Sequence, residues 1–240
     1  MEQLHSITHA DGLISGTIVE RSNRFVVRVQ FDAAPERVYL ADPGELEGIV
    51  EPGHDMLCLP VGDPDRATDY DAISVQINDV HVSVRTALAN DLFESAIKIE
   101  AIPAFHEYEI RHREPSFPEH GRADFLLDTP AGETAFVEVK SCTYVDGRTA
   151  KFPDRQTERG RRHLRSLETL SETGVEAHVV FVIQRPDVDD FVPYREIDPE
   201  FANLLHRIRG DDVGVHAITT LFDPPQYRLA NASLPVRLDE

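Results

Sequence analysis

The amino-acid sequence predicts a mixed α/β (α+β) protein in two parts: a small β-barrel over residues 1–83 and an α/β domain over residues 84–240. Three observations support this organisation. Apolar and polar residues alternate in short runs as far as residue 77, which is typical of half-exposed strands. Apolar residues at helical spacing begin near residue 90. Beyond that point strands and helices follow one another, as expected of a sheet covered by helices.

The composition is that of a globular chain with no membrane-spanning segment. Of the 240 residues, 41% are apolar, and none of the apolar runs reaches the length of about 18 residues that a membrane helix needs. The N-terminal residues lack the basic and then apolar pattern of a secretory signal. Cys58 and Cys142 have neither a zinc-ligand spacing nor a disulfide framework. We therefore expect a cytoplasmic protein with reduced thiols and no membrane partner.

The charge of the chain is strongly negative. The formal net charge is −19, tryptophan is absent, and the three lysines are Lys98, Lys140 and Lys151. Such acidity ordinarily argues against a nucleic-acid partner. An acid-rich, lysine-poor chain also fits a haloarchaeal-type protein of a high-salt cytoplasm, where acidity says little about partners; the alternative is an ordinary acidic protein. At molar salt the Debye length is about 3 Å, so any contact with DNA would be short-range.

One segment has the opposite charge. Between Glu138 and Arg165 the chain carries eight Lys and Arg residues but only four Asp and Glu. A basic segment in so acidic a chain indicates a surface that binds phosphates. The alternative is a solvated helix face that acids elsewhere in the fold balance.

Five short strands are predicted in the N-terminal part, each bounded by turn residues. They cover residues 13–20, 24–31, 36–40, 55–61 and 70–77. Leu46, Ile49 and Val50 indicate a helical turn between the third and fourth strands. This arrangement suits a barrel of the oligonucleotide/oligosaccharide-binding (OB) type, although an unspecific small β-domain fits the same periodicity.

The C-terminal part alternates helices and strands. Predicted helices cover residues 90–99, 157–172 and 199–209. Predicted strands cover residues 108–113, 123–127, 135–141, 177–184 and 214–221, and residues 226–229 are a candidate for one more. The unbroken apolar run at 177–184 indicates a strand buried on both faces. The resulting order is αβββαβαβ.

Charged residues stand on two of these strands. Asp124 lies on the second strand, and Glu138 and Lys140 lie on the third. Residues two apart in a strand share a face, so Glu138 and Lys140 project together. An αβββαβ order with an acid on the second strand and Glu-x-Lys on the third resembles the restriction-endonuclease-like fold and its PD-(D/E)xK signature. Ala123 stands where the signature has its proline, a position at which the proline is often missing.

The residue types explain the chemistry that this resemblance implies. Asp124 and Glu138 would hold Mg²⁺ or Mn²⁺ together with the carbonyl of Val139, because hard divalent ions prefer oxygen ligands. Glu94, on the preceding helix, is a further candidate ligand. The metal would polarise a phosphate and lower the pKa of a bound water, and Lys140 would orient that water or stabilise developing negative charge. The alternative is an E-x-K triplet on a solvated strand face.

Longer stretches of the chain resemble the sugar fermentation stimulation protein family. They are residues 20–25 (ERSNRF), 41–46 (ADPGEL), 122–127 (RADFLL), 137–143 (VEVKSCT), 152–164 (FPDRQTERGRRHL) and 182–185 (VIQR). The resemblance implies an OB-like N-terminal domain, a nuclease-like C-terminal domain and binding to duplex or single-stranded DNA, with a role in regulating sugar-metabolism genes. It does not decide catalysis, because the family is generally described as DNA-binding rather than as a nuclease.

Six arginines are the candidate contacts for nucleic-acid phosphates: Arg21, Arg24, Arg122, Arg155, Arg159 and Arg162. Two of the last three lie near the start of the predicted 157–172 helix, where backbone N–H groups also favour anions. The alternative for each is an ion pair with a nearby acid. Phe25 shares its strand face with Val27 and Val29, so we expect it in the barrel core rather than stacked on a base.

Two other functions remain open at this stage. One is a Mg²⁺- or Mn²⁺-dependent nuclease that cleaves DNA or RNA phosphodiesters at Asp124, Glu138 and Lys140. The other is a regulator that binds a metabolite in the cleft without nucleic acid. The oligomeric state is not predicted.

Overall fold

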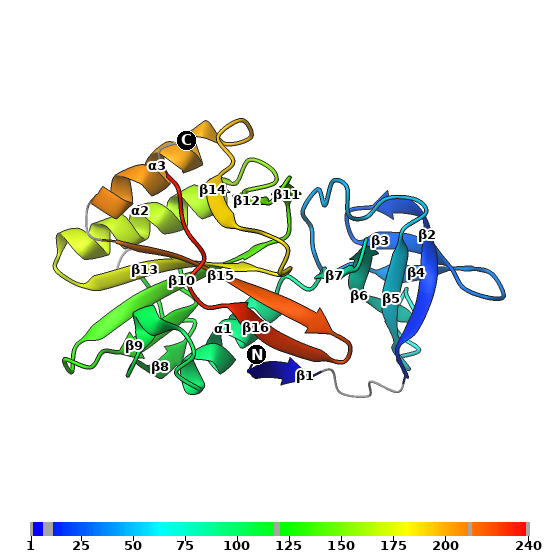
Figure 1. Cartoon of the computed structure of the whole chain (residues 1–240), viewed down its shortest axis with the longest axis horizontal. Helices are drawn as coiled ribbons and strands as arrows, with labels where there is room; N and C mark the ends of the chain where they lie inside the picture. The colour runs from blue at the N-terminus through cyan, green and yellow to red at the C-terminus, as the bar shows by residue number, and fades with distance from the viewer. Residues whose placement is uncertain (1, 7–11, 118–120, 211–212, 239–240) are drawn as a thin grey trace.

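The structure is a computed structural model, and it describes residues 2–6, 12–117, 121–210 and 213–238. A small β-barrel and a larger α/β domain lie side by side (Figure 1). In the described part of the chain, no helix is long and apolar enough to cross a membrane.

The N-terminal barrel contains the five strands that the sequence predicts and one more, β7. Its strands are β2 (Ile14–Asn23), β3 (Val26–Gln30), β4 (Pro35–Tyr39), β5 (Asp55–Pro60), β6 (Tyr70–Ile77) and β7 (Val80–Ser83). The sheet order is β4-β3-β2-β5-β6-β7, and a parallel pairing of β4 with β6 closes five strands into a barrel. Alternate residues such as Val27, Val29 and Val38 are fully buried inside it. The predicted turn is present, with Ile49 N and Val50 N both 3.0 Å from the carbonyl of Leu46.

The prediction for Phe25 is wrong. Its side chain is 41% exposed, and the Arg24 guanidinium lies 5.7 Å from the centre of its ring. Strand β3 begins one residue later, at Val26. The N–H of Phe25 instead donates to Asn23 Oδ1 (2.9 Å). Because Phe25 belongs to the β2–β3 turn, the alternation of the strand does not decide where its ring points.

The C-terminal domain is one seven-stranded sheet with helices on both faces. Its strands are β8 (Glu109–Arg113), β9 (Phe125–Asp128), β10 (Thr134–Cys142), β13 (Glu176–Ile183), β15 (Gly214–Asp223), β16 (Gln226–Asn231) and β1 (Gln3–Ser6). The sheet order is β1-β16-β15-β13-β10-β9-β8. Strands β10, β13 and β15 are mutually parallel. Helix α1 (Leu88–Lys98) covers one face, and α2 (Glu158–Glu172) and α3 (Pro199–Gly210) cover the other.

The central strand explains why the two faces are separate cores. In β13, Val180 and Val182 belong to the cluster under α1, whereas Val179 and Phe181 belong to the cluster under α2 and α3. This is the two-sided burial predicted for the apolar run. The same alternation in β10 puts Val137 under α1, so Glu138 and Lys140 project toward α2.

Several elements were not predicted. Strand β1 pairs antiparallel with β16, so residues 3–6 belong to the C-terminal sheet rather than to the barrel. A small second sheet contains β11 (Val145–Asp146), β12 (Thr149–Phe152) and β14 (Asp190–Pro193). These strands have two to four residues, too few for an alternating pattern to be recognised.

The barrel and the α/β domain are joined by polar contacts. Asp154 Oδ2 accepts from the N–H groups of Glu45 (2.8 Å) and Leu46 (3.4 Å) in the barrel. A Cβ on Gly44 would lie 2.5 Å from the same oxygen, so glycine permits this approach. At a second contact, the N–H of Ser83 donates to the Gln184 carbonyl (3.3 Å). These contacts hold the 44–46 loop beside the chain that leads into α2.

We expect Asp154→Ala to loosen the 44–46 loop. The change removes the acceptor of two backbone N–H groups, each bond contributing about 1 kcal/mol. Hydrogen exchange at Glu45 and Leu46 should accelerate several-fold. Asp79→Ala, at an exposed position of the barrel, is the matched control and should leave both amides unchanged. Equal exchange in Asp154→Ala and the unmodified protein would contradict the role given to this carboxylate.

Candidate functional site

Glu138 is the buried centre of the site. The residue is 2% exposed. Its Oε1 forms an ion pair with Lys140 Nζ and lies 2.5 Å from His163 Nδ1 of α2. Burial favours the neutral acid, but Lys140 and His163 outweigh it and hold the pKa of Glu138 below its usual range. The other oxygen, Oε2, is buried and has no hydrogen-bond partner within the described residues.

Asp124 lies next to Glu138, where β9 begins. The last paired residues of β9 and β10 are Phe125 and Val137, and one further step places Asp124 opposite Glu138. Asp124 Oδ2 accepts from the N–H of Val139 (2.8 Å), and Oδ1 accepts from Asn90 Nδ2 of α1 (2.9 Å). Burial, followed by repulsion from Glu138, raises the pKa of Asp124. A cation between the two carboxylates would relieve that repulsion.

The donor set fits a divalent ion held by two carboxylates. Glu138 Oε2 supplies a buried oxygen without a hydrogen bond, and carboxylate oxygens suit Mg²⁺ and Mn²⁺. The predicted third carboxylate does not join them. Glu94 instead forms ion pairs with Lys98 (2.8 Å) and Arg113 (2.8 Å). Across the ranges that the structure describes, no three His, Cys, Asp or Glu side chains form a metal-binding group, so water or a phosphate would have to complete the coordination.

Lys140 connects this acidic pair to an open cavity between the two domains. The cavity measures about 290 Å³, and Lys140, Arg155 and Arg159 line it together with Asp42 and Gly44 of the barrel. The Lys140 side chain is 14% exposed. The cavity therefore brings together the Glu-x-Lys strand, the basic segment and the barrel, three stretches that are far apart in the sequence.

Three of the predicted phosphate contacts have no carboxylate partner. Within the described residues, Arg155, Arg159 and Arg162 form no ion pair, while Arg148, Arg161 and Arg165 of the same basic segment do. Arg155 is half-buried, and Arg159 and Arg162 are exposed. Arg159 and Arg162 lie on the first turns of α2, where the helix dipole disfavours cations. Their positions are suited to an external anion.

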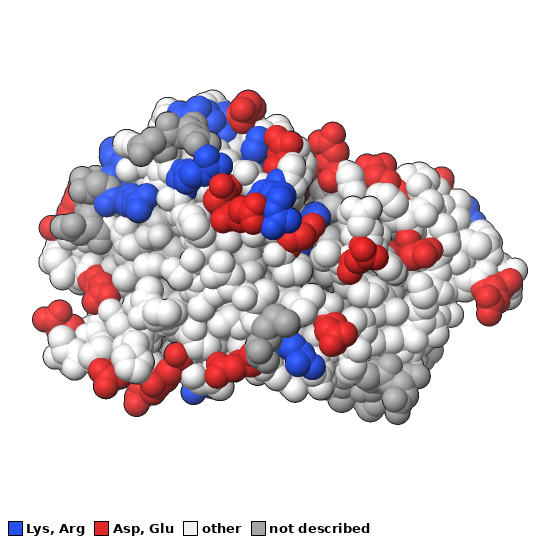
Figure 2. Space-filling view, viewed as in Figure 1, with Lys and Arg blue, Asp and Glu red and all other residues white. Residues whose placement is uncertain are grey.

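The charges of the visible surface are unevenly distributed. Figure 2 shows Lys and Arg gathered over α3 and mixed with Asp and Glu near β14, whereas Asp and Glu predominate over the barrel and the lower edge. The negative charge therefore does not cover the visible face uniformly.

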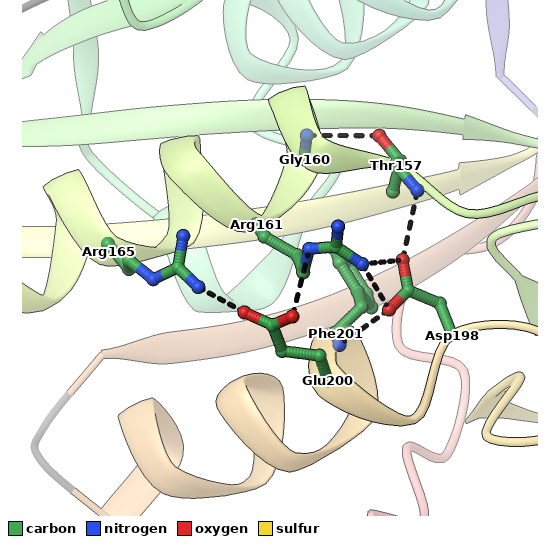
Figure 3. Close-up of polar contacts among 7 residues, drawn as sticks. All are labelled: Thr157, Gly160, Arg161, Arg165, Asp198, Glu200 and Phe201. Carbon is green, nitrogen blue, oxygen red and sulfur yellow. Dashed lines mark hydrogen bonds and ion pairs between the residues drawn. The ribbon is translucent and has the colours of Figure 1, made fainter.

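The start of α2 is held in place by one buried carboxylate, Asp198. Its Oδ2 accepts from the N–H of Thr157 (2.9 Å), its Oδ1 accepts from the N–H of Phe201 (2.9 Å), and both oxygens bind Arg161 (Figure 3). Thr157 in turn caps α2 by accepting from the N–H of Gly160 (3.0 Å). Asp198 thus joins the first turns of α2 and α3.

Gly160 allows the two helices to approach each other. A Cβ at this position would lie 2.7 Å from Thr157 Cγ2 and 3.3 Å from a ring carbon of Phe201. A larger side chain would push the start of α2 away from α3. The glycine within the basic motif therefore has a packing role, and the arginines around it depend on that packing for their positions.

The other three predicted contacts have different environments. Arg21 donates to the carbonyls of Gly44 (2.7 Å) and Glu45, so it stabilises a barrel loop. Arg122 forms an exposed ion pair with Glu114 (3.2 Å). Arg24 is exposed and lies over the ring of Phe25. Arg24 is the one of these three that remains well placed to contact a ligand.

His163 and Asn90 were missed as partners of the two carboxylates. His163 is 5% exposed and faces the sheet from α2. It stands three residues after the buried Gly160 and four before the buried Leu167, so helical spacing puts it on the core face. That spacing was the available signal. Asn90 lies outside the motif, and only the folded chain brings it to Asp124.

Comparison with known proteins identifies the family. Residues 19–84 match the SfsA N-terminal OB domain, and residues 87–226 match the sugar fermentation stimulation protein RE domain. The chain belongs to the sugar fermentation stimulation protein (SfsA) family. A homolog in Methanothermobacter thermautotrophicus is 37% identical over 210 residues, covering 88% of this chain and 87% of that protein. A homolog in Moorella thermoacetica is 35% identical, covering 88% and 91%.

A solved SfsA structure agrees with the whole fold. The structure of Pyrococcus furiosus SfsA in complex with Ca²⁺ is 28% identical and superposes with a TM-score of 0.88, covering 99% of this chain and 100% of that one. The family resemblance seen in the sequence is confirmed, as is the OB domain followed by a mixed α/β domain.

Asp198→Ala should lower the free energy of unfolding by about 2–4 kcal/mol, because it leaves Arg161 and two backbone N–H groups without their buried acceptor. The pKa of Asp198 is lowered: burial opposes ionisation, but the bonds from Thr157, Phe201 and Arg161 prevail. The contribution of ionised Asp198 to the free energy of unfolding is therefore present above about pH 4 and lost at lower pH. Urea unfolding at several pH values measures both effects.

The matched control for this prediction is Asp189→Ala. Asp189 also binds an arginine through two oxygens, but its side chain is 61% exposed. An exposed pair of this kind contributes about 0–1 kcal/mol. Similar losses for the two variants would show that Asp198 has no special role in fixing α2.

Proposed function

We propose that this SfsA-family protein binds DNA in the cleft between its barrel and its α/β domain. The observation that carries the proposal is the set of Arg155, Arg159 and Arg162, which have no ion-pair partner among the described residues of a chain with net charge −19. In a chain with so many acidic residues, three arginines without an acidic partner favour an external polyanion. Lys140 lines the same cavity as Arg155 and Arg159, next to its ion-pair partner Glu138.

The outer face of the barrel carries further side chains that extend the proposed DNA-binding surface. Arg28 and Arg37 are directly opposite each other on β3 and β4, and both are exposed. Glu20 lies 3.9 Å from Arg28 and offsets part of the repulsion between the two arginines, and a bound phosphate would offset more of it. Phe25, with Arg24 over its ring, offers a surface on which a base can stack. Exposed aromatic and arginine side chains of this kind suit single-stranded nucleic acid.

A second function is favoured by one specific observation, the unpartnered Oε2 of Glu138. We propose that Asp124 and Glu138 bind a divalent cation; the SfsA of Pyrococcus furiosus, in its solved structure, is in complex with Ca²⁺. Bound there, the ion would act as a Lewis acid on a phosphate. Lys140 would hold a phosphate oxygen by charge, and His163 would keep Glu138 oriented. This set of residues supports hydrolysis of a phosphodiester in DNA or RNA as the alternative function.

The finer assignments stay predictions. They are the regulation of sugar-metabolism genes, the cytoplasmic location and the adaptation to high salt inferred from the composition.

Replacing Arg155, Arg159 and Arg162 together by Ala should weaken DNA binding and flatten its dependence on salt. Each lost phosphate contact should reduce the slope of log K against log salt by about 1. Fluorescence anisotropy with labelled duplex and single-stranded DNA at two or more salt concentrations measures this. Arg111→Ala, at an arginine paired with Asp128 (2.6 Å), should leave the slope unchanged. Absence of binding to either DNA at low salt would refute the proposal.

Mn²⁺ or Ca²⁺ should raise the unfolding temperature of the unmodified protein, since an ion at 100 times its Kd stabilises the folded state by about 2.7 kcal/mol. Glu138→Gln and Asp124→Asn should abolish the shift. Glu94→Gln should retain it, because Glu94 is engaged by Lys98 and Arg113. A shift that survives in Glu138→Gln would place the ion elsewhere.

The same variants test catalysis. With Mn²⁺ and labelled DNA or RNA, a nuclease should lose cleavage in both Glu138→Gln and Lys140→Ala. Cleavage that persists in both would come from a contaminant. Ion binding without cleavage would favour a binding protein that uses its metal to hold phosphate.

A further inference from the structure

A second group of polar side chains lies at the other end of the sheet from Lys140. His178 is on β13 and His216 is on the neighbouring parallel strand β15. The pairing joins His178 to Gly214 and Val180 to His216, so the two histidines are diagonal neighbours on one face. Nδ1 of His178 lies 3.2 Å from Nε2 of His216. Both residues are near the amino ends of their strands, whereas Lys140, which lines the cavity, is near the carboxyl end of β10.

The other nitrogen of His178 is held by a carboxylate. His178 Nε2 is 2.8 Å from Glu176 Oε1, and the Tyr108 hydroxyl donates to the same oxygen (2.5 Å). With its Nε2 proton donated to Glu176, neutral His178 presents the lone pair of Nδ1 toward His216. A histidine that binds a metal is commonly oriented by a carboxylate in this way.

The backbone of Gly214 passes close to the two nitrogens. A Cβ at Gly214 would lie 2.1 Å from His178 Nδ1 and 2.7 Å from His216 Nε2. The backbone φ of Gly214 is outside the left-handed region, so its conformation alone does not require glycine. Glycine at this position therefore lets both imidazole nitrogens keep their places, and a side chain there would displace them.

Both imidazoles are held in the neutral form, which is the form that binds metals. Burial lowers the pKa of His178. Burial, followed by His178 and Arg209, lowers the pKa of His216 to about 4. His216 also lines a cavity of about 330 Å³, which gives water a route to the pair.

We propose that His178 Nδ1 and His216 Nε2 together bind one transition-metal ion of the Zn²⁺, Ni²⁺ or Cu²⁺ class. Nitrogens bound tetrahedrally at about 2.0–2.1 Å are separated by about 3.3–3.4 Å, close to the 3.2 Å found here. Imidazole prefers these ions, while Mg²⁺ and Mn²⁺ prefer the carboxylates of the other site. Because no third protein ligand gathers among the described residues, water completes the coordination. The ion would link the amino ends of β13 and β15.

Titration calorimetry with Zn²⁺ on the full chain without an affinity tag tests the proposal. The unmodified protein and Glu138→Gln should each bind one Zn²⁺ at this site, because Glu138 belongs to the other site. His216→Ala should lose that binding, and Gly214→Ala should lose it with both histidines present. Glu176→Gln should weaken it about tenfold. His112→Ala, at an exposed position, is the matched control and should bind as the unmodified protein does.

Electron paramagnetic resonance distinguishes the loss of a metal ligand from the loss of folded protein. Cu²⁺ bound to the unmodified protein should show two coupled nitrogens in its electron paramagnetic resonance spectrum, and His216→Ala should show at most one. The absence of Zn²⁺ binding by Glu138→Gln, or equal binding by His216→Ala, would overturn the proposal. DNA binding should be the same in His216→Ala as in the unmodified protein, so failure of this proposal is distinguishable from failure of the proposed function.

Discussion

A carboxylate buried within a sheet must be balanced by nearby donors, and Glu138 is balanced from two elements at once. Lys140 comes from its own strand and His163 comes from α2. The charge of Glu138 thereby ties the central sheet to the helix that carries the basic segment. Removing either donor would leave a buried charge undercompensated, which is costly. The acidic pair and the arginines are therefore parts of one packed unit rather than two independent surfaces.

The basic segment divides into arginines that build the fold and arginines that face outward. Arg161 is bound to Asp198, and Arg165 pairs with Glu200 on the next helix. Those contacts fix the start of α2 against α3 and leave Arg159 and Arg162 presented on a rigid helix. A binding group on a rigid element loses less conformational freedom when a ligand arrives. The motif thus combines arginines that hold α2 against α3 with arginines that point to the surface.

Much of the fold followed from local patterns, and the exceptions have physical causes. The two-sided burial of β13 and the helix α2 were predictable because each follows from the pattern of neighbouring residues. Strand β1 was not predictable, because its four residues are too few to show an alternating pattern. At the site, Glu138 and Lys140 share a strand, so their proximity was predictable. The ion pair of Glu94 with Lys98 follows the i,i+4 spacing of one helix, but its ion pair with Arg113 was not predictable, because the spacing along a helix does not show which cation a distant strand supplies.

The pairing of β1 with β16 changes how the barrel is attached. Strand β1 lies in the α/β sheet, the chain then runs through the barrel, and it returns to the α/β domain at α1. The barrel is therefore inserted into the other domain through two connections. A domain with two connections rotates less freely than a domain on a single linker. The two walls of the cavity that Lys140 and Arg155 line are thus joined by the path of the chain as well as by the contacts of Asp154.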